Sequence, residues 1–192
     1  MVFIVVLNWL MFYFLHSFLA DTQIKEKTRK LTGLSKRQYR LTYTIFSTFH
    51  FLALIGIYYL LPKEEFIHLP YSKIVFIITL IFGTIIIVSS FHIISIKEFT
   101  GLEKQNDPPQ LIKSGIYKYI RHPIYTGTIL IILGWLYSSL NLYSLIIVVI
   151  SFLYLPIGIW LEERKLIKEF GDNYILYKNY VGGIIPKYKS RN

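Results

Sequence analysis

The sequence contains no cysteine, which excludes disulfide bonds, thiolate metal ligands and a cysteine nucleophile. Charge is also scarce, because only 17% of the 192 residues are charged while 54% are hydrophobic. The mean hydropathy is +0.47. An ordinary soluble domain of this length is less apolar than this. The composition therefore predicts a membrane protein that crosses the bilayer several times.

Five apolar stretches are candidates for crossing the bilayer, which takes ~20 residues. They are residues 2–20, 41–61, 74–96, 124–140 and 143–161. The last two stretches almost touch in sequence, which predicts a tight helical hairpin. We therefore expect an all-α fold, a polytopic membrane helical bundle with about five transmembrane helices and a cytoplasmic C-terminal helical tail. Residues 1–73 are expected to form scaffold helices and residues 74–192 the functional core, within one integrated domain.

Acidic residues are few, 11 against 21 lysines and arginines, so the formal net charge is +10. The basic residues cluster in alternate loops and in the tail, and the loop between the second and third stretches holds only Lys63 and Lys73. This alternation predicts a multi-pass protein with its N-terminus outside and its C-terminus in the cytoplasm. The first stretch has no basic n-region or small-residue cleavage site, so we expect it to be retained. The basic residues are expected to interact with the lipid bilayer, whose anionic lipids attract them, and no nucleic-acid partner is expected.

Three histidines, His16, His50 and His92, fall within the apolar stretches. No aspartate, glutamate or cysteine accompanies them there, so the usual ligand sets for zinc or iron are incomplete and no metal is expected. Hydrogen bonds between helices are the expected role of these histidines.

The segment Arg121-His122-Pro123-Ile124-Tyr125-Thr126-Gly127 stands where a basic loop enters the fourth stretch. Proline is favoured at the first helical position, so a helix is predicted to begin at Pro123 with His122 beside its N-terminus. The free N–H groups and the dipole at that end favour an anion.

Glu162 and Glu163 stand at the end of the fifth stretch, at about the same predicted depth as Arg121 and His122. Such a convergence matches a ligand that carries both a carboxylate and an ammonium group, as the methionyl end of S-adenosyl-L-methionine does. The alternative is that these charges only hold the helix ends at the membrane interface. The residue types alone leave both interpretations open.

Further motifs follow one another in a fixed order. They are Ser114-Gly115-Ile116-Tyr117, the segment from Arg121 to Gly127, Glu162-Glu163-Arg164-Lys165-Leu166, Phe170-Gly171-Asp172-Asn173-Tyr174, Tyr177 and Ile185-Pro186. Together they resemble the isoprenylcysteine carboxyl methyltransferase and phospholipid methyltransferase group of integral membrane enzymes, over about residues 110–186. The resemblance implies S-adenosyl-L-methionine as cofactor. The residues that it assigns to cofactor binding are Gln110, Leu111, Ile112, Tyr117, His122, Pro123, Ile124, Tyr125 and Glu162. It makes Arg121 and His122 candidates for a catalytic role.

Two further features of the resemblance bear on the identity of the methyl acceptor. In isoprenylcysteine carboxyl methyltransferases an arginine about one turn before the paired glutamates contacts the substrate, whereas Gly158 stands there in this chain. Further motifs lie towards the N-terminus: Leu15-His16-Ser17, Tyr39-Arg40-Leu41 with Tyr43, and Phe99-Thr100-Gly101-Leu102. These resemble the NnrU, nurim and methanethiol S-methyltransferase branch. The resemblance favours a small thiol over a lipidated acceptor, whether an isoprenylcysteine carboxyl group or a phospholipid amine.

Two other functions are open at this stage. A small transporter needs ionisable residues deep in its spans, and only the three histidines are placed there. A non-catalytic membrane organiser that has kept the architecture of an enzyme would bind the cofactor without transferring its methyl group.

Overall fold

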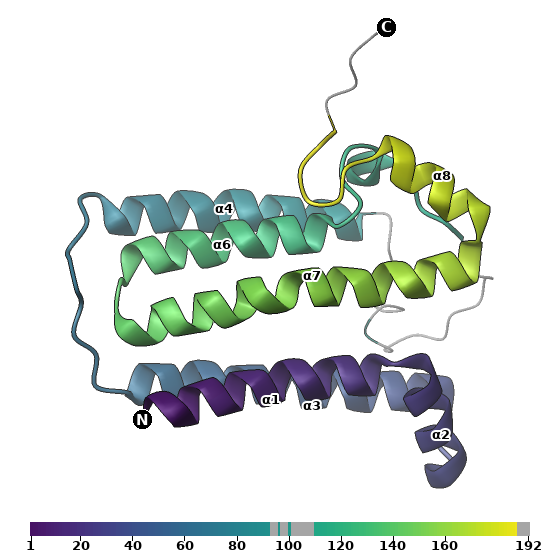
Figure 1. The fold of residues 1–192 in the computed structure, drawn as a ribbon, viewed down its shortest axis with the longest axis horizontal. Coiled ribbons are helices and arrows are strands. Elements are labelled where there is room, and N and C mark those ends of the chain that lie inside the picture. Colours follow the sequence, from purple (N-terminus) through teal and green to yellow (C-terminus); the bar gives the residue numbers. More distant parts are fainter. Residues whose placement is uncertain (93–95, 97–99, 101–109, 188–192) are drawn as a thin grey trace, which may run out of the picture. The chain divides into compact units, whose positions relative to one another are not determined.

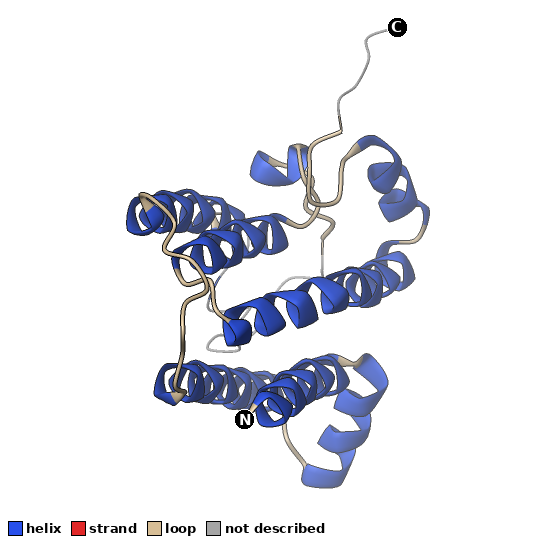
Figure 2. Ribbon diagram, turned by 60° about the vertical axis from the view of Figure 1, so that its left-hand side comes forward, coloured by secondary structure: helices blue, strands red, loops and turns tan. Residues whose placement is uncertain are grey.

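The computed structural model describes residues 1–92, 96, 100 and 110–187. Within these residues it contains α-helices and one 3₁₀ helix and no strand, as Figure 1 and Figure 2 show. The α-helices are α1 (Val2–Ala20), α2 (Thr22–Thr32), α3 (Lys36–Leu60), α4 (Ser72–Phe91), α6 (Pro123–Ser138), α7 (Leu142–Phe170) and α8 (Asp172–Tyr180). The 3₁₀ helix η1 spans Gly115–Lys118. The predicted all-α fold is confirmed.

Four helices, α1, α3, α4 and α7, are long and apolar enough to cross a membrane, and α6 is a shorter apolar helix of 16 residues. The chain is therefore a polytopic helical membrane protein, as predicted. α1 has the predicted bounds. The fifth predicted span ends at residue 161, and the helical spacing of Leu166, Ile167 and Phe170 predicts that its helix continues out of the membrane; α7 extends to Phe170, and Pro156 lies inside it without ending it. α6 ends at Ser138 and α7 begins at Leu142, so the predicted short connection is present.

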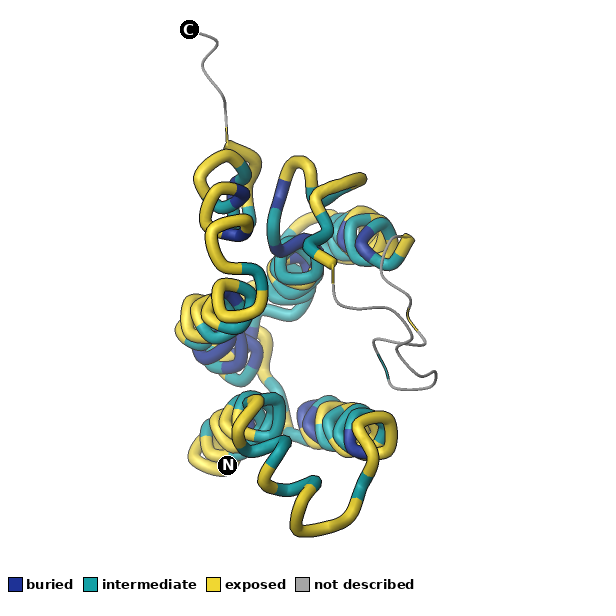
Figure 3. Tube along the Cα trace, turned by 90° about the vertical axis from the view of Figure 1, so that its right-hand side faces the viewer, coloured by how far each residue is buried: buried dark blue, intermediate teal, exposed yellow. Residues whose placement is uncertain are grey.

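Large apolar side chains are exposed along these helices. Phe3 is 74% exposed, Phe49 70% and Leu153 69%. Figure 3 shows exposed positions in yellow along the spans. A soluble protein rarely exposes apolar surface so extensively, whereas the acyl chains of a bilayer accept it at little cost. The exposed surface therefore fits a lipid environment.

The chain divides into two compact units, and neither is one continuous stretch. Unit 1 comprises Met1–Phe66, Ser95–Asp107 and Asn141–Tyr154, and unit 2 comprises Ile67–Ile94, Pro108–Leu140 and Leu155–Asn192. Unit 1 therefore holds α1, α2, α3 and the first part of α7, and unit 2 holds α4, η1, α6, the rest of α7 and α8. The first turns of α7 belong to unit 1 because they bond to α1 and α3.

Polar side chains join the helices of unit 1. The hydroxyl of Tyr13 on α1 donates to Ser151 Oγ on α7 at 2.7 Å. The hydroxyl of Tyr43 on α3 lies 3.0 Å from His16 Nδ1 on α1. Hydrogen bonds of this kind hold membrane helices together, which is the role predicted for His16. No group of three or more His, Cys, Asp or Glu residues in the described part of the chain is placed to hold a metal ion.

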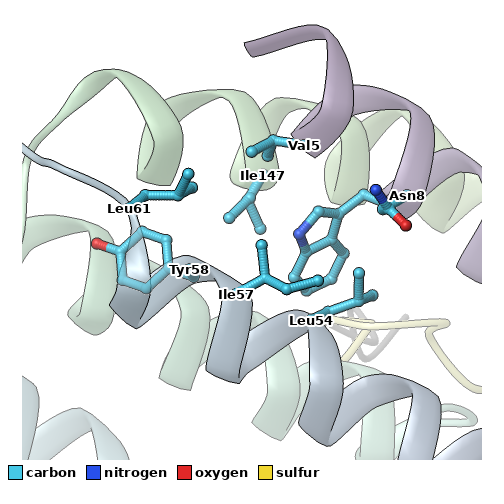
Figure 4. A pocket seen from close by; sticks show the side chains of 8 residues that line it. Val5, Asn8, Leu54, Ile57, Tyr58, Leu61 and Ile147 are labelled. Carbon is cyan, nitrogen blue, oxygen red and sulfur yellow. The ribbon is translucent and has the colours of Figure 1, made fainter. Parts of the chain in front are cut away.

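A small apolar cavity lies in unit 1 between side chains of α1, α3 and α7 (Figure 4). Its lining includes Val5, Trp9, Leu54 and Ile147, together with the ring of Tyr58. No charged group lines the cavity, so it lacks the chemistry expected of a site for a charged cofactor.

Asn141 fixes the start of α7 in unit 1. Its Oδ1 accepts hydrogen bonds from the N–H groups of Tyr143 and Ser144, both at 3.0 Å, and its Nδ2 donates to the hydroxyl of Tyr58 at 2.9 Å. Asn141 is 1% exposed. Because Asn141→Ala removes a helix cap and a buried interhelical bond, we expect a loss of about 2 kcal/mol in stability. Thermal unfolding in detergent should show a lower Tm for this variant and an unchanged Tm for the exposed control Asn173→Ala. Equal Tm values for both variants would contradict this role.

α4 and α6 pack closely side by side in unit 2 through glycines (Figure 1). A Cβ atom on Gly127 would lie 2.5 Å from the carbonyl oxygen of Gly83, and one on Gly83 would lie 2.7 Å from the carbonyl oxygen of Gly127. A Cβ atom on Gly134 would overlap the side chain of Thr79. Small residues allow such close backbone approach between membrane helices. This contact fixes α6, whose first turn carries the candidate site.

α7 ends at Phe170, and α8 follows after a single residue, Gly171. Gly171 has φ +54°, a left-handed conformation that favours glycine. In the sequence, glycine followed by aspartate is typical of a helix stop and a new N-cap, which predicts a stop at Gly171 and an N-cap at Asp172. Gly171 is itself the N-cap, and Asp172 is the first residue of α8.

Candidate functional site

The start of α6 carries His122 and Pro123. Pro123 is the first residue of the helix and His122 is its N-cap, as predicted. Both residues are buried, and the His122 side chain is only 1% exposed. No side chain caps this helix end. The positive end of the α6 dipole is therefore not matched by a capping side chain.

A buried carboxylate on α7 meets three basic side chains beside this helix start. Arg121 donates to Glu163 Oε1 from Nη2 at 2.6 Å and from Nε at 3.1 Å. His122 Nε2 lies 3.2 Å from the same oxygen, and Lys178 Nζ donates to Glu163 Oε2 at 2.5 Å. The side chains of Arg121 and Glu163 are 9% and 8% exposed. These four residues, which we call the Glu163 cluster, join the start of α6 to α7 and α8.

The segment after α8, residues 181–184, bonds to the same helix start and is called the strap below. The N–H of Arg121 donates to the carbonyl of Gly182 at 2.8 Å. The N–H of His122 donates to the carbonyl of Gly183 at 3.0 Å. A Cβ atom on Gly182 would overlap the backbone carbonyl three residues later, so the strap requires glycine there. The strap thus fixes the backbone of both basic residues.

Glu162 faces the other nitrogen of the His122 imidazole. Its Oε2 atom lies 3.4 Å from His122 Nδ1, and its side chain is 45% exposed. His122 Nδ1 is buried and has no hydrogen-bond partner within the described residues. A buried polar atom without a partner is unfavourable. A donor from a ligand would therefore be stabilised beside the His122–Glu162 pair.

Two tyrosines surround the His122–Glu162 pair. The ring of Tyr125 packs edge-on against the His122 imidazole, with centroids 5.7 Å apart and planes at 87°. The hydroxyl of Tyr117 on η1 bonds to Ser90 and lies near Glu162. Burial raises the pKa of Tyr117, the Ser90 hydrogen bond lowers it, and the charge of Glu162 raises it. Tyr117 therefore remains a neutral phenol beside a carboxylate.

α8 packs onto η1 through its buried tyrosines. Tyr174, Tyr177 and Val181 recur at helical spacing, which predicts an apolar stripe on the tail, and Tyr174 and Tyr177 are 1% and 7% exposed. The hydroxyl of Tyr177 donates to the carbonyl of Tyr117 at 2.6 Å. Burial raises the pKa of Tyr177 to about 12, with the charge of Arg121 opposing the rise, so this hydroxyl stays a donor at neutral pH. The tail thereby supports the element that carries Tyr117.

The residues predicted to bind the cofactor fall into two groups. The group around the start of α6 is His122, Pro123, Ile124, Tyr125, Tyr117 and Glu162. The other group, Gln110, Leu111 and Ile112, lies in the coil before η1, where Gln110 is exposed and its two neighbours are partly buried. The predicted convergence of Arg121 and His122 with the paired glutamates is confirmed. Phe99, Gly101 and Leu102 of the N-terminal motifs lie outside the described residues.

The sequence placed both glutamates in the predicted convergence, but it gave the ligand contact to Glu162 and did not predict the contacts of Glu163 with Arg121 and Lys178. Adjacent residues of an α-helix point about 100° apart, so the paired glutamates necessarily make different contacts. This difference in direction is the sequence feature that could have indicated a separate role for Glu163. Lys178 is one of several lysines in the tail, and nothing in its spacing distinguishes it. The carbonyl groups of the strap carry no side-chain signal at all.

Residues 71–173 match the family model described as "Phospholipid methyltransferase". Over 180 residues, 89% of this chain, the sequence is 32% identical to "Methanethiol S-methyltransferase 1" of Bradyrhizobium diazoefficiens and covers 62% of that protein. It is 27% identical over 184 residues to "Methanethiol S-methyltransferase" of Crocosphaera subtropica, covering 89% of this chain and 69% of that relative.

A stretch of 84 residues, 43% of this chain, is 37% identical to "Protein-S-isoprenylcysteine O-methyltransferase" of Saccharomyces cerevisiae and covers 35% of that protein. The chain thus spans about three fifths of the length of the Bradyrhizobium protein and about a third of the yeast protein. No solved structure matches the chain.

Proposed function

The chain belongs to the phospholipid methyltransferase family, and from this premise we propose that it is an integral membrane methyltransferase that uses S-adenosyl-L-methionine as methyl donor. The family match includes both Arg121–His122 and Glu162–Glu163. The relatives described above are named methyltransferases. The observation that carries the proposal is the buried Nδ1 atom of His122, which accepts or donates no hydrogen bond among the described residues and lies beside the half-exposed carboxylate of Glu162.

The residues present fit the methionyl end of this cofactor. An ammonium group carries three hydrogens and is able to donate to Glu162 and to His122 Nδ1 together. The start of α6, which lacks a side-chain cap, favours an anionic group such as the methionyl carboxylate. Tyr117 and Tyr125, which are partly buried, add aromatic surface beside these groups. In this proposal His122 and Glu162 would hold the ammonium group.

Arg121 acts on the site through other residues in this proposal. Its Nε and Nη2 atoms donate to Glu163, and its Nη1 atom donates to the carbonyls of Lys178, at 3.0 Å, and Val181. All three guanidinium nitrogens therefore have partners within the protein. We propose that Arg121 holds the strap and Glu163 in place, and its catalytic role stays a prediction.

S-adenosyl-L-methionine supplies a methyl group that its sulfonium already activates toward a nucleophile. The chain itself therefore has to align the acceptor and exclude water. His122 and Pro123 are buried at the helix start and limit access of water there. A thiol acceptor must also lose its proton before transfer. Because Nδ1 of His122 is proposed to face the ammonium group, a catalytic role for His122 also stays a prediction.

A small thiol is the favoured acceptor. The relatives that align over 89% of this chain are named methanethiol S-methyltransferases, whereas the yeast isoprenylcysteine O-methyltransferase aligns over 43%. Gly158 is buried and brings no cation to the position one turn before the paired glutamates. This favours a small thiol over an isoprenylcysteine carboxyl group. The distribution of basic residues supports a cytoplasmic cofactor site, with the N-terminus outside and the C-terminal tail in the cytoplasm.

Methyl transfer can be tested with S-adenosyl-L-methionine labelled on its methyl group. Membranes that contain the protein are expected to release label as a volatile sulfide when methanethiol is supplied, and membranes that contain Glu162→Ala are expected to release only background label. Label in the lipid or protein fraction would instead indicate a phospholipid or prenylated-protein acceptor. Cofactor binding without transfer to any fraction would favour a non-catalytic organiser and contradict the enzyme.

A further inference from the structure

Glu163 can only accept hydrogen bonds in its ionised form. Its Oε1 atom accepts from Arg121 twice, and its Oε2 atom accepts from Lys178. The carboxylate is therefore held from both sides and cannot rotate freely. Its Oε1 atom lies 3.2 Å from His122 Nε2, with both side chains buried. At this distance the imidazole nitrogen that faces Glu163 has to be a donor.

The position of one hydrogen decides what the imidazole offers to a ligand. In a neutral imidazole one nitrogen carries the hydrogen and the other accepts. The opposite tautomer would set a lone pair of Nε2 against the Glu163 carboxylate, which is unfavourable in a buried site. The Glu163 carboxylate already faces the cations of Arg121 and Lys178. Glu162 lies farther from the imidazole, 3.4 Å from Nδ1, and its side chain is 45% exposed, so water screens its charge there and a lone pair on Nδ1 is less unfavourable than one on Nε2.

We propose that Glu163 is a positioning residue that keeps the His122 hydrogen on Nε2 and so leaves Nδ1 as an acceptor for the ligand. The partner of a histidine's second nitrogen sets its tautomer in this way at many functional sites. Glu163 thereby raises the affinity for the ammonium group without touching it. The role of Nδ1 rests on the proposed function, whereas the tautomer itself is a property of the free protein.

Lys178 extends this positioning to the tail. Its ammonium group bonds to Glu163, and its carbonyl accepts from Arg121. Its side chain is 43% exposed, so its contact with Glu163 is partly screened by water. Lys178→Met should therefore weaken binding less than loss of the Glu163 carboxylate, by about threefold or less.

The tautomer is measured by NMR on ligand-free protein labelled with ¹⁵N-histidine, in detergent micelles. The chain has five histidines, and the signals of His122 are those missing from the spectrum of His122→Gln. Glu163→Gln keeps an oxygen able to face Nε2, whereas Glu163→Leu removes it. Glu163→Leu with Arg121→Met removes both members of the buried ion pair, which avoids an unpaired charge should the single variant fail to fold.

We expect wild-type His122 to carry its hydrogen on Nε2. Either leucine variant should populate both tautomers and bind S-adenosyl-L-homocysteine at least about tenfold more weakly, while Glu163→Gln stays within about threefold of wild type. A hydrogen on Nδ1 in the wild type, or an unchanged tautomer and affinity in a folded leucine variant, would overturn the proposal. Loss of wild-type binding with the hydrogen on Nε2 would instead overturn the proposed function and leave the tautomer assignment standing.

Discussion

Glu162→Ala is expected to weaken the binding of S-adenosyl-L-homocysteine by roughly 10- to 100-fold, the usual effect of removing a hydrogen bond to a charged group. The carboxylate of Glu162 lies 3.4 Å from His122 Nδ1 and is still 45% exposed, so it is placed to receive the ammonium group of a ligand. Removing it leaves that group with the His122 imidazole alone. The measurement is isothermal titration of detergent-purified protein.

Glu169→Ala is the matched control for this experiment. Glu169 lies two turns further along α7, on nearly the same face of the helix, and is exposed. Its replacement removes the same charge and is expected to leave the affinity unchanged. Equal affinities for wild type, Glu162→Ala and Glu169→Ala would show that the pair does not bind the methionyl end.

Gly127→Ala is expected to destabilise the protein by about 3 kcal/mol, at the upper end of overpacking effects in well-packed interiors. The added Cβ would lie 2.5 Å from the carbonyl oxygen of Gly83, a backbone atom that cannot move aside as a side chain does. α4 and α6 would have to separate. Because Gly127 lies in the second turn of α6, the shift would also displace His122 and weaken cofactor binding. Thermal unfolding in detergent, followed by titration at a temperature where the variant is folded, measures both effects.

Gly56→Ala is the control for the glycine variant. A Cβ atom on Gly56 in α3 would meet no atom within 4 Å, so alanine should be neutral there or stabilising by up to about 1 kcal/mol through its higher helix propensity. If Gly127→Ala is as stable as Gly56→Ala, the close approach of α4 and α6 does not contribute to stability.

The sequence predicts a helix well when the residues that define its bounds are neighbours in the chain. The apolar run of α1 has no competing feature, and its predicted and observed bounds coincide. Pro123 marks the start of α6 because it requires no N–H partner and has a helical φ. In α7 the hydropathy ends at Leu161, whereas the helical spacing of Leu166 and Phe170 predicts that the helix continues out of the membrane, and α7 does extend to Phe170. Hydropathy measures where the membrane ends, and it does not measure where the helix ends.

The site was only partly accessible from sequence. The convergence of two charged motifs follows from the short connection between α6 and α7. Which glutamate becomes buried depends on the helical phase of α7, and a shift of one residue exchanges Glu162 and Glu163. The strap holds Arg121 and His122 through backbone carbonyls, which are the same in every residue type. Such contacts depend on the path of the backbone and not on the types of side chain. The sequence shows only that position 182 is a glycine, which this path requires.

The most direct measurement compares the affinities of the wild-type protein for S-adenosyl-L-homocysteine and for the otherwise identical analogue that lacks the amino group. If His122 and Glu162 bind the ammonium group, the analogue should bind at least about tenfold more weakly, and this difference should nearly vanish in Glu162→Ala. Equal affinity of the wild type for both compounds, or a difference that persists undiminished in Glu162→Ala, would contradict the central role of the His122–Glu162 pair.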